Sequence, residues 1–487
     1  MWGDRGEHVP QVTLFFNDKD RGIMSRFQPE IIHQQLGAAF YDKVEAASFP
    51  DAILRYRNQA AADKVGLGGL DDESWIAHFA HFRPLEGSFS QPLALRYHGH
   101  QFGSYNPEIG DGRGFLFAQM REVGTGRLLD LGTKGSGTTP YSRTADGKLT
   151  LKGAVREIMA TEMLAALNVP TSQTFSVIET GEALMRHDEP SPTRSAVMVR
   201  LLNSHIRIGS FQRCAYLGDD KSTEALARHV VAHHYPNCDP HQDADTLYLA
   251  LLTALVARVA DMVGAWMVAG FVHGVMNTDN FNLTGETFDF GPWRFLPHCD
   301  PAFTAAYFDQ QSRYAYGRQP EAALWALCRL ADCFVHVTNQ EVMQQALAEF
   351  YPQMEASLAR RLVWRLGLQE VPAEQADALT KQFYQAAQSS RYGWDALFQD
   401  LYGGTLSSKD ERWHTQPDLL ALQKMLAGFR PRQSGDIRQA LKSAELVSLE
   451  ISQVEAVWDR IAEQDDWSAL QTLLDRIRTY GEQLQHS

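Results

Sequence analysis

Two short segments of the chain carry oxygen ligands that could bind one divalent metal ion. The first segment ends in Asn280, and the second, Asp289-Phe290-Gly291, begins nine residues after it. Mg²⁺ takes hard oxygen ligands, usually one or two from protein carboxylates and amides, while water and phosphate oxygens complete its shell. An amide on a loop and a carboxylate on the next short hairpin can meet around such an ion. We therefore predict that Asn280 and Asp289 are metal ligands and that Asp289 also borders a bound nucleotide.

The spacing around these residues is that of protein kinases, with one departure. Kinases carry a loop of the form H-R-D-x-x-x-x-N followed by D-F-G, and His273 aligns with the His of that loop. The position of the kinase catalytic Asp holds Val275, which cannot accept a proton. Asp279 is the only carboxylate in the loop. Three alternatives stay open: Asp279 is the proton acceptor, it positions metal or substrate, or the chain is a kinase-like binder without catalytic activity.

Lys134 and Glu157 fit the opposite wall of such a site. Kinase-type sites hold phosphates with a Lys on a strand, which pairs with a Glu from the following helix. Lys134 ends a strand predicted over 128–134, and Glu157 lies on a helix predicted over 151–167. Glu162 is on the same helix but faces another direction, so it is the weaker partner. We expect Lys134 and Glu157 to form an ion pair.

Glycine-rich turns and further cations lie near Lys134 in the sequence. Gly110, Gly112 and Arg113 belong to the run Gly-Asp-Gly-Arg-Gly at 110–114. Glycines let the backbone approach phosphate oxygens, and the fork of an arginine matches them. Arg200 and Arg207 lie seven residues apart, where a β-rich region joins a helical one. Four cations would then face a nucleotide cleft in a protein that is acidic overall.

Hydrophobic periodicity predicts an α+β fold. Residues 85–205 contain short β-type runs around one helix, which is not a regular βαβ alternation. After about 205 the pattern is helical, and it includes a long helix that ends near Gly270. Soft boundaries near 80, 205 and 345 divide the chain into 1–80, 81–205, 206–345 and 346–487. Further expected elements are an amphipathic helix around 30–47, strands at 115–118, 174–178, 196–201 and 288–290, and helices from about 320 to 484.

Composition excludes several classes of protein. The chain has 487 residues, 45 Lys and Arg, 59 Asp and Glu, and a formal charge of −14, which argues against a nucleic-acid or anionic-membrane binder. Its five cysteines contain no CxxC pair, so we expect free thiols in a reducing compartment. The most apolar stretch, 247–272, is interrupted by Arg258 and Asp261 and is expected to be a buried helix. The first residues resemble no secretory signal, and we expect a cytoplasmic protein.

Four longer motifs, together with the Asp-Phe-Gly segment, resemble the selenoprotein O family of protein adenylyltransferases. They are HGHQFGSYNPEIGDGRG (98–114), KGSGTTPYSRTADGKL (134–149), REIMATEMLAALNVPT (156–171) and GFVHGVMNTDNFNL (270–283) with DFGP (289–292). The resemblance covers residues 85–310 well and is looser before 80 and after about 345. It implies a protein-kinase-like, two-lobed fold: a β-rich N-lobe with one key helix over 81–205 and a helical C-lobe over 206–345. Residues 1–80 would be an N-terminal extension of mixed helix and loop, and 346–487 a helical C-terminal region.

The resemblance also implies an activity and a role for each site residue. ATP would bind in a reversed orientation, with Mg²⁺ or Mn²⁺, and AMP would pass to Ser, Thr or Tyr hydroxyls of protein substrates. Asp279 matches the proton acceptor, Glu157 the partner of the lysine, and Asn280 and Asp289 the metal ligands. A phosphotransferase moving the γ-phosphoryl group and a silent ATP-binding scaffold remain alternatives. The positions that match nucleotide contacts are Gly110, Gly112, Arg113, Lys134, Asp146, Gly147, Arg200 and Arg207.

Many members of that family end in a short tail that bears cysteine or selenocysteine. This chain ends in Gly-Glu-Gln-Leu-Gln-His-Ser, and its last cysteine is Cys333. We therefore expect no redox switch through such a tail here.

Overall fold

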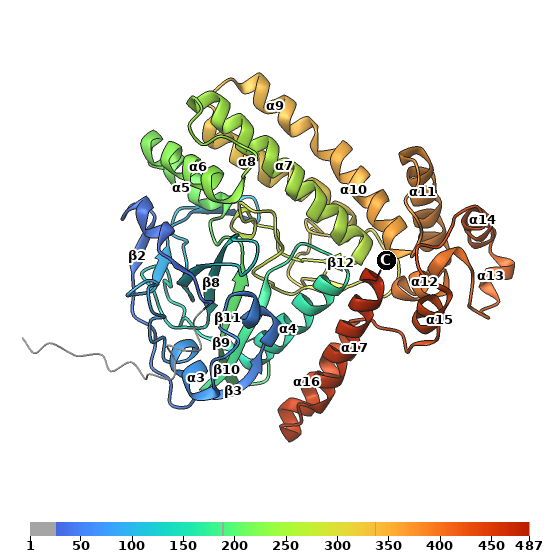
Figure 1. The fold of residues 1–487 in the computed structure, drawn as a ribbon, viewed down its shortest axis with the longest axis horizontal. Helices are drawn as coiled ribbons and strands as arrows, with labels where there is room; N and C mark the ends of the chain where they lie inside the picture. Colours follow the sequence, from blue (N-terminus) through green and yellow to red (C-terminus); the bar gives the residue numbers. More distant parts are fainter. Residues whose placement is uncertain (1–25, 188, 337, 487) are drawn as a thin grey trace, which may run out of the picture.

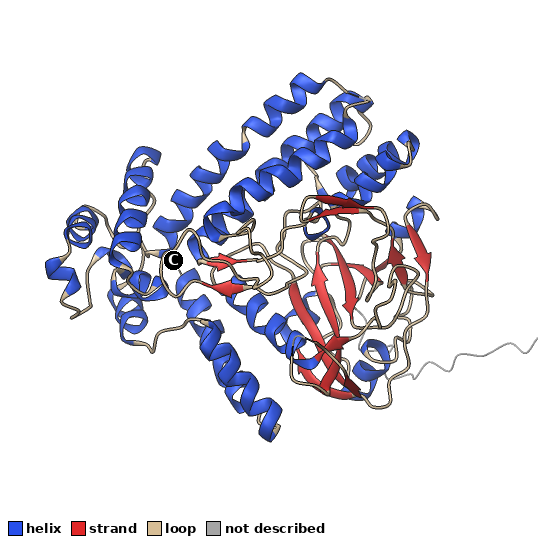
Figure 2. Cartoon of the chain, turned by 180° about the vertical axis from the view of Figure 1, so that it is seen from behind, coloured by secondary structure: helices blue, strands red, loops and turns tan. Residues whose placement is uncertain are grey.

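Strands gather in one part of the molecule and helices in the other. The computed structural model describes residues 26–187, 189–336 and 338–486; the part of the predicted N-terminal extension before residue 26 lies outside them. Figures 1 and 2 show a β-rich part, a helical part beside it and a cluster of shorter helices at the far end. The expected α+β class is confirmed.

The main sheet contains nine antiparallel strands. Met198 pairs with Lys134, and Arg200 pairs with Gly132. Because side chains alternate between the faces of a sheet, Lys134 and Arg200 project from the same face. The strand order is β2 (Tyr41–Lys43), β4 (Leu93–Leu95), β7 (Leu116–Arg121), β8 (Leu128–Lys134), β11 (Thr193–Leu202), β10 (Gln173–Leu184) and β3 (Ile53–Arg57), while β1 (Pro29–Glu30) pairs with β7 and β9 (Leu149–Thr150) with β11.

The predicted helix over 151–167 is α4, Leu151–Ala166. Thr150 caps it by accepting a hydrogen bond from the Gly153 N–H. Asn168, with φ of +56°, and Pro170 follow its end. Its apolar residues are buried in the largest core cluster of the described residues, so packing against the sheet fixes the helix. Other elements of this part are α2 (Gln59–Lys64), α3 (Asp72–Phe79), β5 (Gly99–Gln101) and β6 (Ser104–Asn106).

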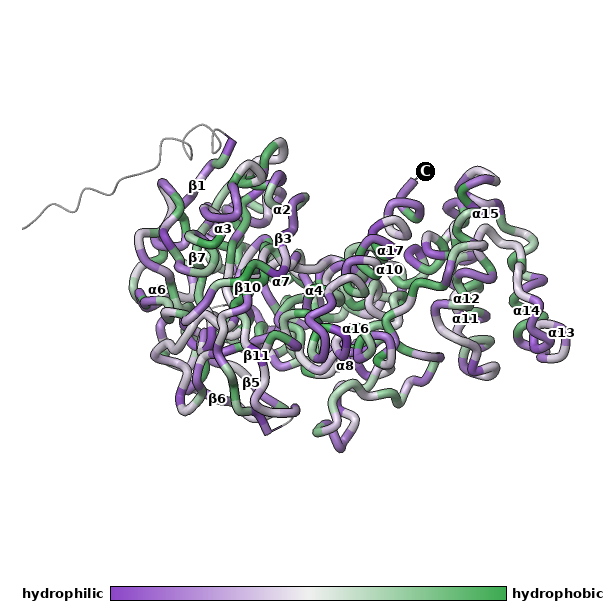
Figure 3. The backbone as a smooth tube through the Cα atoms, turned by 90° about the horizontal axis from the view of Figure 1, so that it is seen from below, coloured by the Kyte–Doolittle hydropathy of each residue, from purple (hydrophilic) through white to green (hydrophobic). Residues whose placement is uncertain are grey.

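The helical part is built around α7, Ala244–Ala269. Asp243 caps its first turn, and Gly270, with φ of +70°, ends it. In length and composition α7 could cross a membrane, but 61% of its most apolar window is buried inside the structure, as in a core helix. Its neighbours include α6 (Asp220–His234) and α10 (Phe350–Arg365). Hydrophobic stretches such as α7 and β10 lie inside the molecule (Figure 3). The remaining elements of this part are α5 (Ile208–Tyr216), α6 (Asp220–His234), β12 (Phe271–Val272), β13 (Arg294–Phe295), α8 (Gln319–Ala331), α9 (Gln340–Ala348) and α10 (Phe350–Arg365).

The C-terminal helices fold back onto α4. Arg478 pairs with Glu162 at 2.8 Å, and Lys152 with Glu455 at 2.6 Å. The last two helices therefore contact the helix that carries Glu157, and they do not form a separate body. The helices of this region are α11 (Ala373–Ser390), α12 (Trp394–Asp400), α13 (Arg412–Thr415), α14 (Pro417–Leu426), α15 (Gly435–Ser443), α16 (Ile451–Gln464) and α17 (Ser468–Gln485).

Two predicted elements are wrong. The amphipathic helix over 30–47 is replaced by a short 3₁₀ helix, Ile32–Leu36, which lies between β1 and β2. Pairing of β2 with β4 outweighs the helical periodicity of this segment. Residues 288–290 form no strand, because Asp289 has φ of +55°, outside the region that strands use.

The packing of α17 on α4 predicts the effect of one substitution. A Cβ atom at Gly481 would lie 2.8 Å from the Cα of Ala166, a helix backbone that cannot move aside easily. We expect Gly481→Leu to lower the free energy of unfolding by about 1–3 kcal/mol, as overpacked sites do. Urea denaturation measures this change. Thr479→Leu, at an exposed position of the same helix, is the control, and an equal loss in both variants would contradict the prediction.

Candidate active site

Lys134 and Glu157 form a buried ion pair, as predicted from their spacing. The Nζ of Lys134 lies 2.7 Å from Oε2 of Glu157, and the two side chains are 4% and 3% exposed. The same ammonium also donates to the backbone oxygen of Phe290 at 3.2 Å. Glu162, the weaker candidate, points away from Lys134 and binds Arg478. The pair joins β8 to α4 and leaves Lys134 directed toward Asp289.

Three cations converge on the carboxylate of Asp289. Lys134 Nζ lies 3.3 Å and Arg200 Nη1 3.4 Å from its Oδ1, and Arg207 Nη1 lies 3.8 Å from its Oδ2. Burial alone would raise the pKa of Asp289, but the charges of Lys134, Arg200 and Arg207 together hold that pKa well below its usual value. Asp289 is therefore ionised, and it shares the three cations with Glu157, which pairs with Lys134, and with Asp111, which pairs with Arg207.

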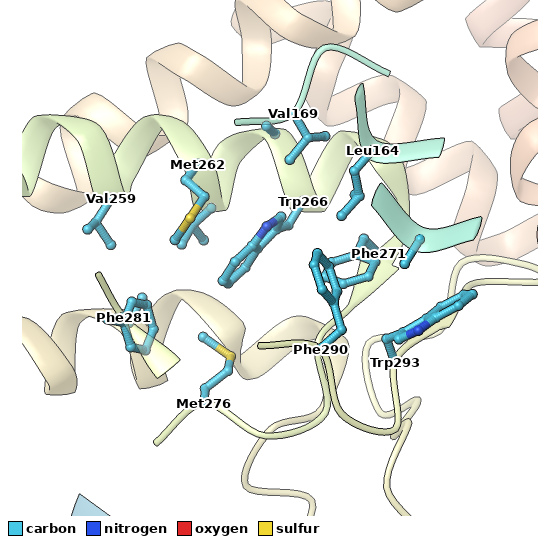
Figure 4. Packing of buried hydrophobic residues seen from close by; sticks show 14 of the residues in the cluster. Leu164, Val169, Val259, Met262, Trp266, Phe271, Met276, Phe281, Phe290 and Trp293 are labelled. Atoms are coloured by element: carbon cyan, nitrogen blue, oxygen red, sulfur yellow. The ribbon is translucent and has the colours of Figure 1, made fainter. Parts of the chain in front are cut away.

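Packing of the next residue fixes Asp289 in its unusual backbone conformation. The ring of Phe290 stacks on His273, with centroids 6.2 Å apart, and lies 6.1 Å from the ring of Phe271. Figure 4 shows Phe290 and Phe271 together in the core, with Trp266 of α7 beside them. The hydrophobic core thus holds the Asp-Phe-Gly segment so that its carboxylate faces the cations.

Asp279 lies near Asp289 on the 3₁₀ turn Thr278–Asn280. Burial raises the pKa of its carboxyl to about 6; the Arg207 charge opposes this rise and the Asp289 charge adds to it. Its Oδ1 is buried and accepts no hydrogen bond from the residues that the structure describes. At neutral pH such a carboxylate is largely ionised, and its pKa is close to the optimum for accepting a proton.

Most of the predicted residues line two adjoining cavities, whereas Asn280, Asp146 and Gly147 line neither. The first holds about 300 Å³ and is lined by Gly110, Gly112, Asp279 and Asp289, among other residues. The second holds about 270 Å³ and contains Glu157. Residues that border both cavities are Arg113 and Lys134. A larger cavity of about 920 Å³ is lined in part by the β7–β8 turn, and none of the predicted site residues lines it.

The glycines of the 110–114 turn are required by close contacts. A Cβ atom at Gly110 would lie 2.5 Å from the ring of Tyr141, and one at Gly112 would lie 2.9 Å from the Tyr141 carbonyl oxygen. Ser142 donates a hydrogen bond to the Gly112 carbonyl. The turn therefore packs closely against 139–142 and presents Arg113 to both cavities.

Asp146 and Gly147 stand apart from the other predicted nucleotide contacts. The Asp146 carboxylate is 48% exposed and pairs with Arg186 at 2.8 Å, and Gly147 has φ of +69°. Neither residue lines the first cavity. The structure connects them to the site only through Arg186 and Lys148, which border the second cavity.

The oxygens around Asn280 and Asp289 fit a divalent metal ion. Oδ1 of Asn280 is buried without a hydrogen-bond partner among the described residues, and its Nδ2 donates to the Asp289 backbone oxygen at 3.4 Å. No group of three His, Cys, Asp or Glu side chains in the described ranges could hold a metal. One amide and one carboxylate nevertheless suit Mg²⁺, which takes its remaining ligands from water and phosphate.

Sequence patterns missed the side chains that hold Arg207. This arginine is 2% exposed, donates to the Tyr97 hydroxyl at 3.2 Å and lies 3.3 Å from Oδ1 of Asp111. Asp111 also accepts a hydrogen bond from the Leu95 N–H at 3.0 Å. In the sequence, only the position of Asp111 between Gly110 and Gly112 indicated that this residue belongs to the site. Tyr97 carried no such indication, because it is 110 residues away from Arg207 in the chain.

Comparison with known proteins agrees with this geometry. A family model described as protein adenylyltransferase SelO matches residues 23–478. Relatives named protein nucleotidyltransferase YdiU include those of Synechocystis sp., 38% identical over 92% of this chain and 97% of the relative, and of Trichormus variabilis, 40% identical over 94% and 97%. The relative from Synechococcus elongatus is 42% identical over 92% of this chain and 94% of its own length.

Among solved structures, the chain is similar to ROP2 from Toxoplasma gondii, described as a virulence factor with a protein-kinase fold and no enzymatic activity. The two share 10% sequence identity with a TM-score of 0.24, over 76% of this chain and 90% of that one. This likeness is too weak to bear on activity. The family model and the relatives span nearly the whole chain, and on that ground the chain belongs to the SelO family of protein adenylyltransferases.

Proposed function

We propose that this protein transfers AMP from ATP to hydroxyl groups of Ser, Thr or Tyr side chains in other proteins and releases pyrophosphate. The observation that carries the proposal is the convergence of Lys134, Arg200 and Arg207 on Asp289 at the border of one cavity. A triphosphate with its metal would neutralise these cations. Membership of a family described as protein adenylyltransferases supports the choice of adenylyl transfer.

The proposed step is an in-line displacement at the α-phosphorus. The acceptor hydroxyl oxygen forms a bond to that phosphorus, and the bond to the oxygen that bridges the α- and β-phosphorus breaks. Pyrophosphate leaves with the electron pair, and the hydroxyl proton passes to the carboxylate of Asp279. The chain's own contribution is mainly positioning and neutralisation of charge, as in phosphoryl transfer generally.

Asn280 and Asp289 would hold Mg²⁺ or Mn²⁺, which supplies positive charge to the phosphate oxygens during the displacement. Lys134, held by Glu157, and Arg113 border both cavities, so they would contact the polyphosphate from the opposite side. In the reversed orientation that the family resemblance implies, the base and the reacting phosphorus would occupy different ones of these two adjoining cavities.

Val275 is compatible with this arrangement. Its side chain lies near Gly291, because a Cβ atom at that glycine would be 3.8 Å from Val275 Cγ2. Asp279 borders the first cavity beside Arg207. A base at position 279 serves a reacting phosphorus in that cavity, so a carboxylate at position 275 is not required.

Asp279→Asn tests the proposed proton acceptor. The amide keeps the shape of the side chain but cannot take a proton at neutral pH, so we expect the transfer rate to fall by about 10²–10⁴-fold. Affinity for a fluorescent ATP analogue should stay within about twofold of the wild-type value, since Asp279 is not assigned to ATP binding. Full activity in this variant would remove Asp279 from the chemistry.

The leaving group distinguishes the proposed reaction from its alternatives. The protein is incubated with ATP, Mg²⁺ and dephosphorylated casein, and the small products are separated by ion-exchange chromatography. Adenylyl transfer yields pyrophosphate in proportion to modified casein. ADP would indicate a phosphotransferase. Absence of both products while ATP still raises the melting temperature would indicate a binding scaffold.

A further inference from the structure

Three exposed aromatic side chains form one contiguous cluster near the proposed active site. Phe102, Tyr307 and Phe308 are 43%, 82% and 45% exposed. The ring of Phe308 lies 5.9 Å from that of Phe102 and 5.2 Å from that of Tyr307. We call these three residues the aromatic patch. Single exposed apolar residues are normal on a protein surface, whereas the largest contiguous apolar patch of a monomer is often functional.

The backbone at Phe102 disfavours an aromatic residue. Phe102 and Gly103 form the two-residue turn between β5 and β6, with φ of +50° and +88°. Turns with two positive φ angles favour Asn-Gly, and a bulky residue is strained in the first position. A phenylalanine at position 102 is therefore unfavourable both for its backbone conformation and for its exposure to water. A residue kept under such strain commonly serves binding or catalysis.

Hydrogen bonds fix the patch to the loop that carries Asp279. The Phe102 N–H donates to Oδ1 of Asn277 at 3.0 Å, and the Tyr314 hydroxyl donates to the same oxygen at 3.0 Å. A Cβ atom at Gly99 would lie 3.4 Å from Oδ1 of Asp279, so the β5–β6 hairpin runs directly beside that carboxylate. The patch thus has a defined position relative to the proposed proton acceptor.

The loop that carries the other two rings is also held in place. The carboxylate of Asp309 is 6% exposed and accepts hydrogen bonds from the N–H groups of Arg313 and Tyr314, at 2.9 and 2.8 Å. These bonds close the loop immediately after Tyr307 and Phe308. An ordered loop presents the two rings without the entropy cost of ordering them when a partner binds.

We propose that the aromatic patch docks the acceptor polypeptide, by binding an apolar or aromatic side chain next to the hydroxyl residue that receives AMP. This inference rests on the proposed function. The acceptor is the occupant because the patch is continuous with the loop of Asp279, where the acceptor hydroxyl must arrive. Arg313 borders Gly103, and its guanidinium lies over the ring of Trp325 without an acidic partner among the residues that the structure describes, so it would complement a carboxylate on the same polypeptide. Aromatic and arginine side chains carry much of the binding energy at protein interfaces.

Two variants test the patch without disturbing the ATP site. Phe102→Asn places a residue that the turn favours, and Tyr307→Ser/Phe308→Ser removes the two exposed rings. The probe is dephosphorylated casein with ATP labelled at the α-phosphate. We expect kcat/KM for casein to fall by about tenfold in each variant, mainly through KM. Affinity for a fluorescent ATP analogue and the melting temperature should not fall. The matched control is Tyr351→Ser, which removes an aromatic side chain on α10 that is 40% exposed. This variant should behave as the wild type.

The outcomes distinguish docking of the acceptor from self-association of the chain and from failure of the proposed function. Wild-type kinetics with casein in both variants would overturn the docking proposal and leave the proposed function intact. A change in sedimentation from dimer to monomer in the variants would assign the patch to a second copy of this chain and also overturn the proposal. If the wild-type protein itself transfers no label to casein or to itself, the proposed function fails, and the docking proposal fails with it.

Discussion

Asp289→Asn is expected to lower the rate of AMP transfer by at least about a hundredfold, comparable to losing one preorganised electrostatic group from an active site. The substitution keeps the size of the side chain but removes the charge that would hold the metal. It also removes one of the counter-charges shared by Lys134, Arg200 and Arg207, which all lie within 4 Å of the carboxylate, and leaves Glu157 and Asp111 as their remaining acidic partners. The melting temperature of the nucleotide-free protein should therefore fall as well. Initial rates with α-labelled ATP and a thermal scan measure the two effects.

Asp300→Asn is a suitable control for that experiment. Its carboxylate accepts a hydrogen bond from the Ala302 N–H at 2.9 Å, and it borders neither of the two cavities. We expect it to keep the wild-type rate. An Asp289→Asn protein that transfers AMP as fast as this control would show that the carboxylate is only a counter-ion for the cations.

Arg365→Met is expected to lower the free energy of unfolding by about 3–5 kcal/mol, the usual cost of removing one partner from a buried ion pair. Arg365 and Asp395 are 1% and 6% exposed and lie 2.5 Å apart, between α10 and α12. Arg365 also donates to the backbone oxygen of Val268 at 2.6 Å. Burial raises the pKa of Asp395, and the charge of Arg365 opposes that rise. Without the arginine this carboxyl must stay buried and unpaired or take up a proton.

Urea denaturation measures this loss of stability, and two further variants interpret it. Arg360→Met removes a pair with Asp261 in which the arginine is 59% exposed, and it should change stability by less than about 1 kcal/mol. Arg365→Met combined with Asp395→Leu removes both buried charges and should recover part of the loss. Equal losses for Arg365→Met and Arg360→Met would contradict the argument from burial.

Local patterns in the sequence predicted the parts of the site that lie on single elements. Lys134 closes a run of strand-forming residues, and Glu157 lies on a helix with clear apolar spacing and a proline stop. The proposed metal ligands Asn280 and Asp289 are nine residues apart in the chain, and the structure brings Nδ2 of Asn280 to 3.4 Å from the Asp289 backbone oxygen. In each case the residues that decide the geometry are close together in the chain or belong to a known spacing.

Contacts between distant segments could not be predicted. Arg207 is held by Tyr97 and Asp111, which are 110 and 96 residues away. Arg478 reaches Glu162 across 316 residues, so nothing local indicated that the last helix contacts α4. Such pairs depend on the tertiary packing of whole elements.

Both wrong predictions arose because tertiary contacts outweigh the local preference of the segment. Residues 30–47 have helical apolar spacing, but their backbone pairs with strands far along the chain, and tertiary pairing outweighs weak local preference. Phe288–Phe290 reads as a strand from its aromatic residues. The positive φ of Asp289 and the packing of Phe290 in the core decide otherwise.

The most direct test of the account follows two labels. The protein is incubated with Mg²⁺, casein and ATP labelled either at the α-phosphate or at the γ-phosphate, and the label attached to protein is counted. The account predicts that the α-label alone becomes attached and that Asp279→Asn reduces it by at least about a hundredfold. Attachment of the γ-label, or equal α-labelling by the Asp279→Asn variant, would contradict it.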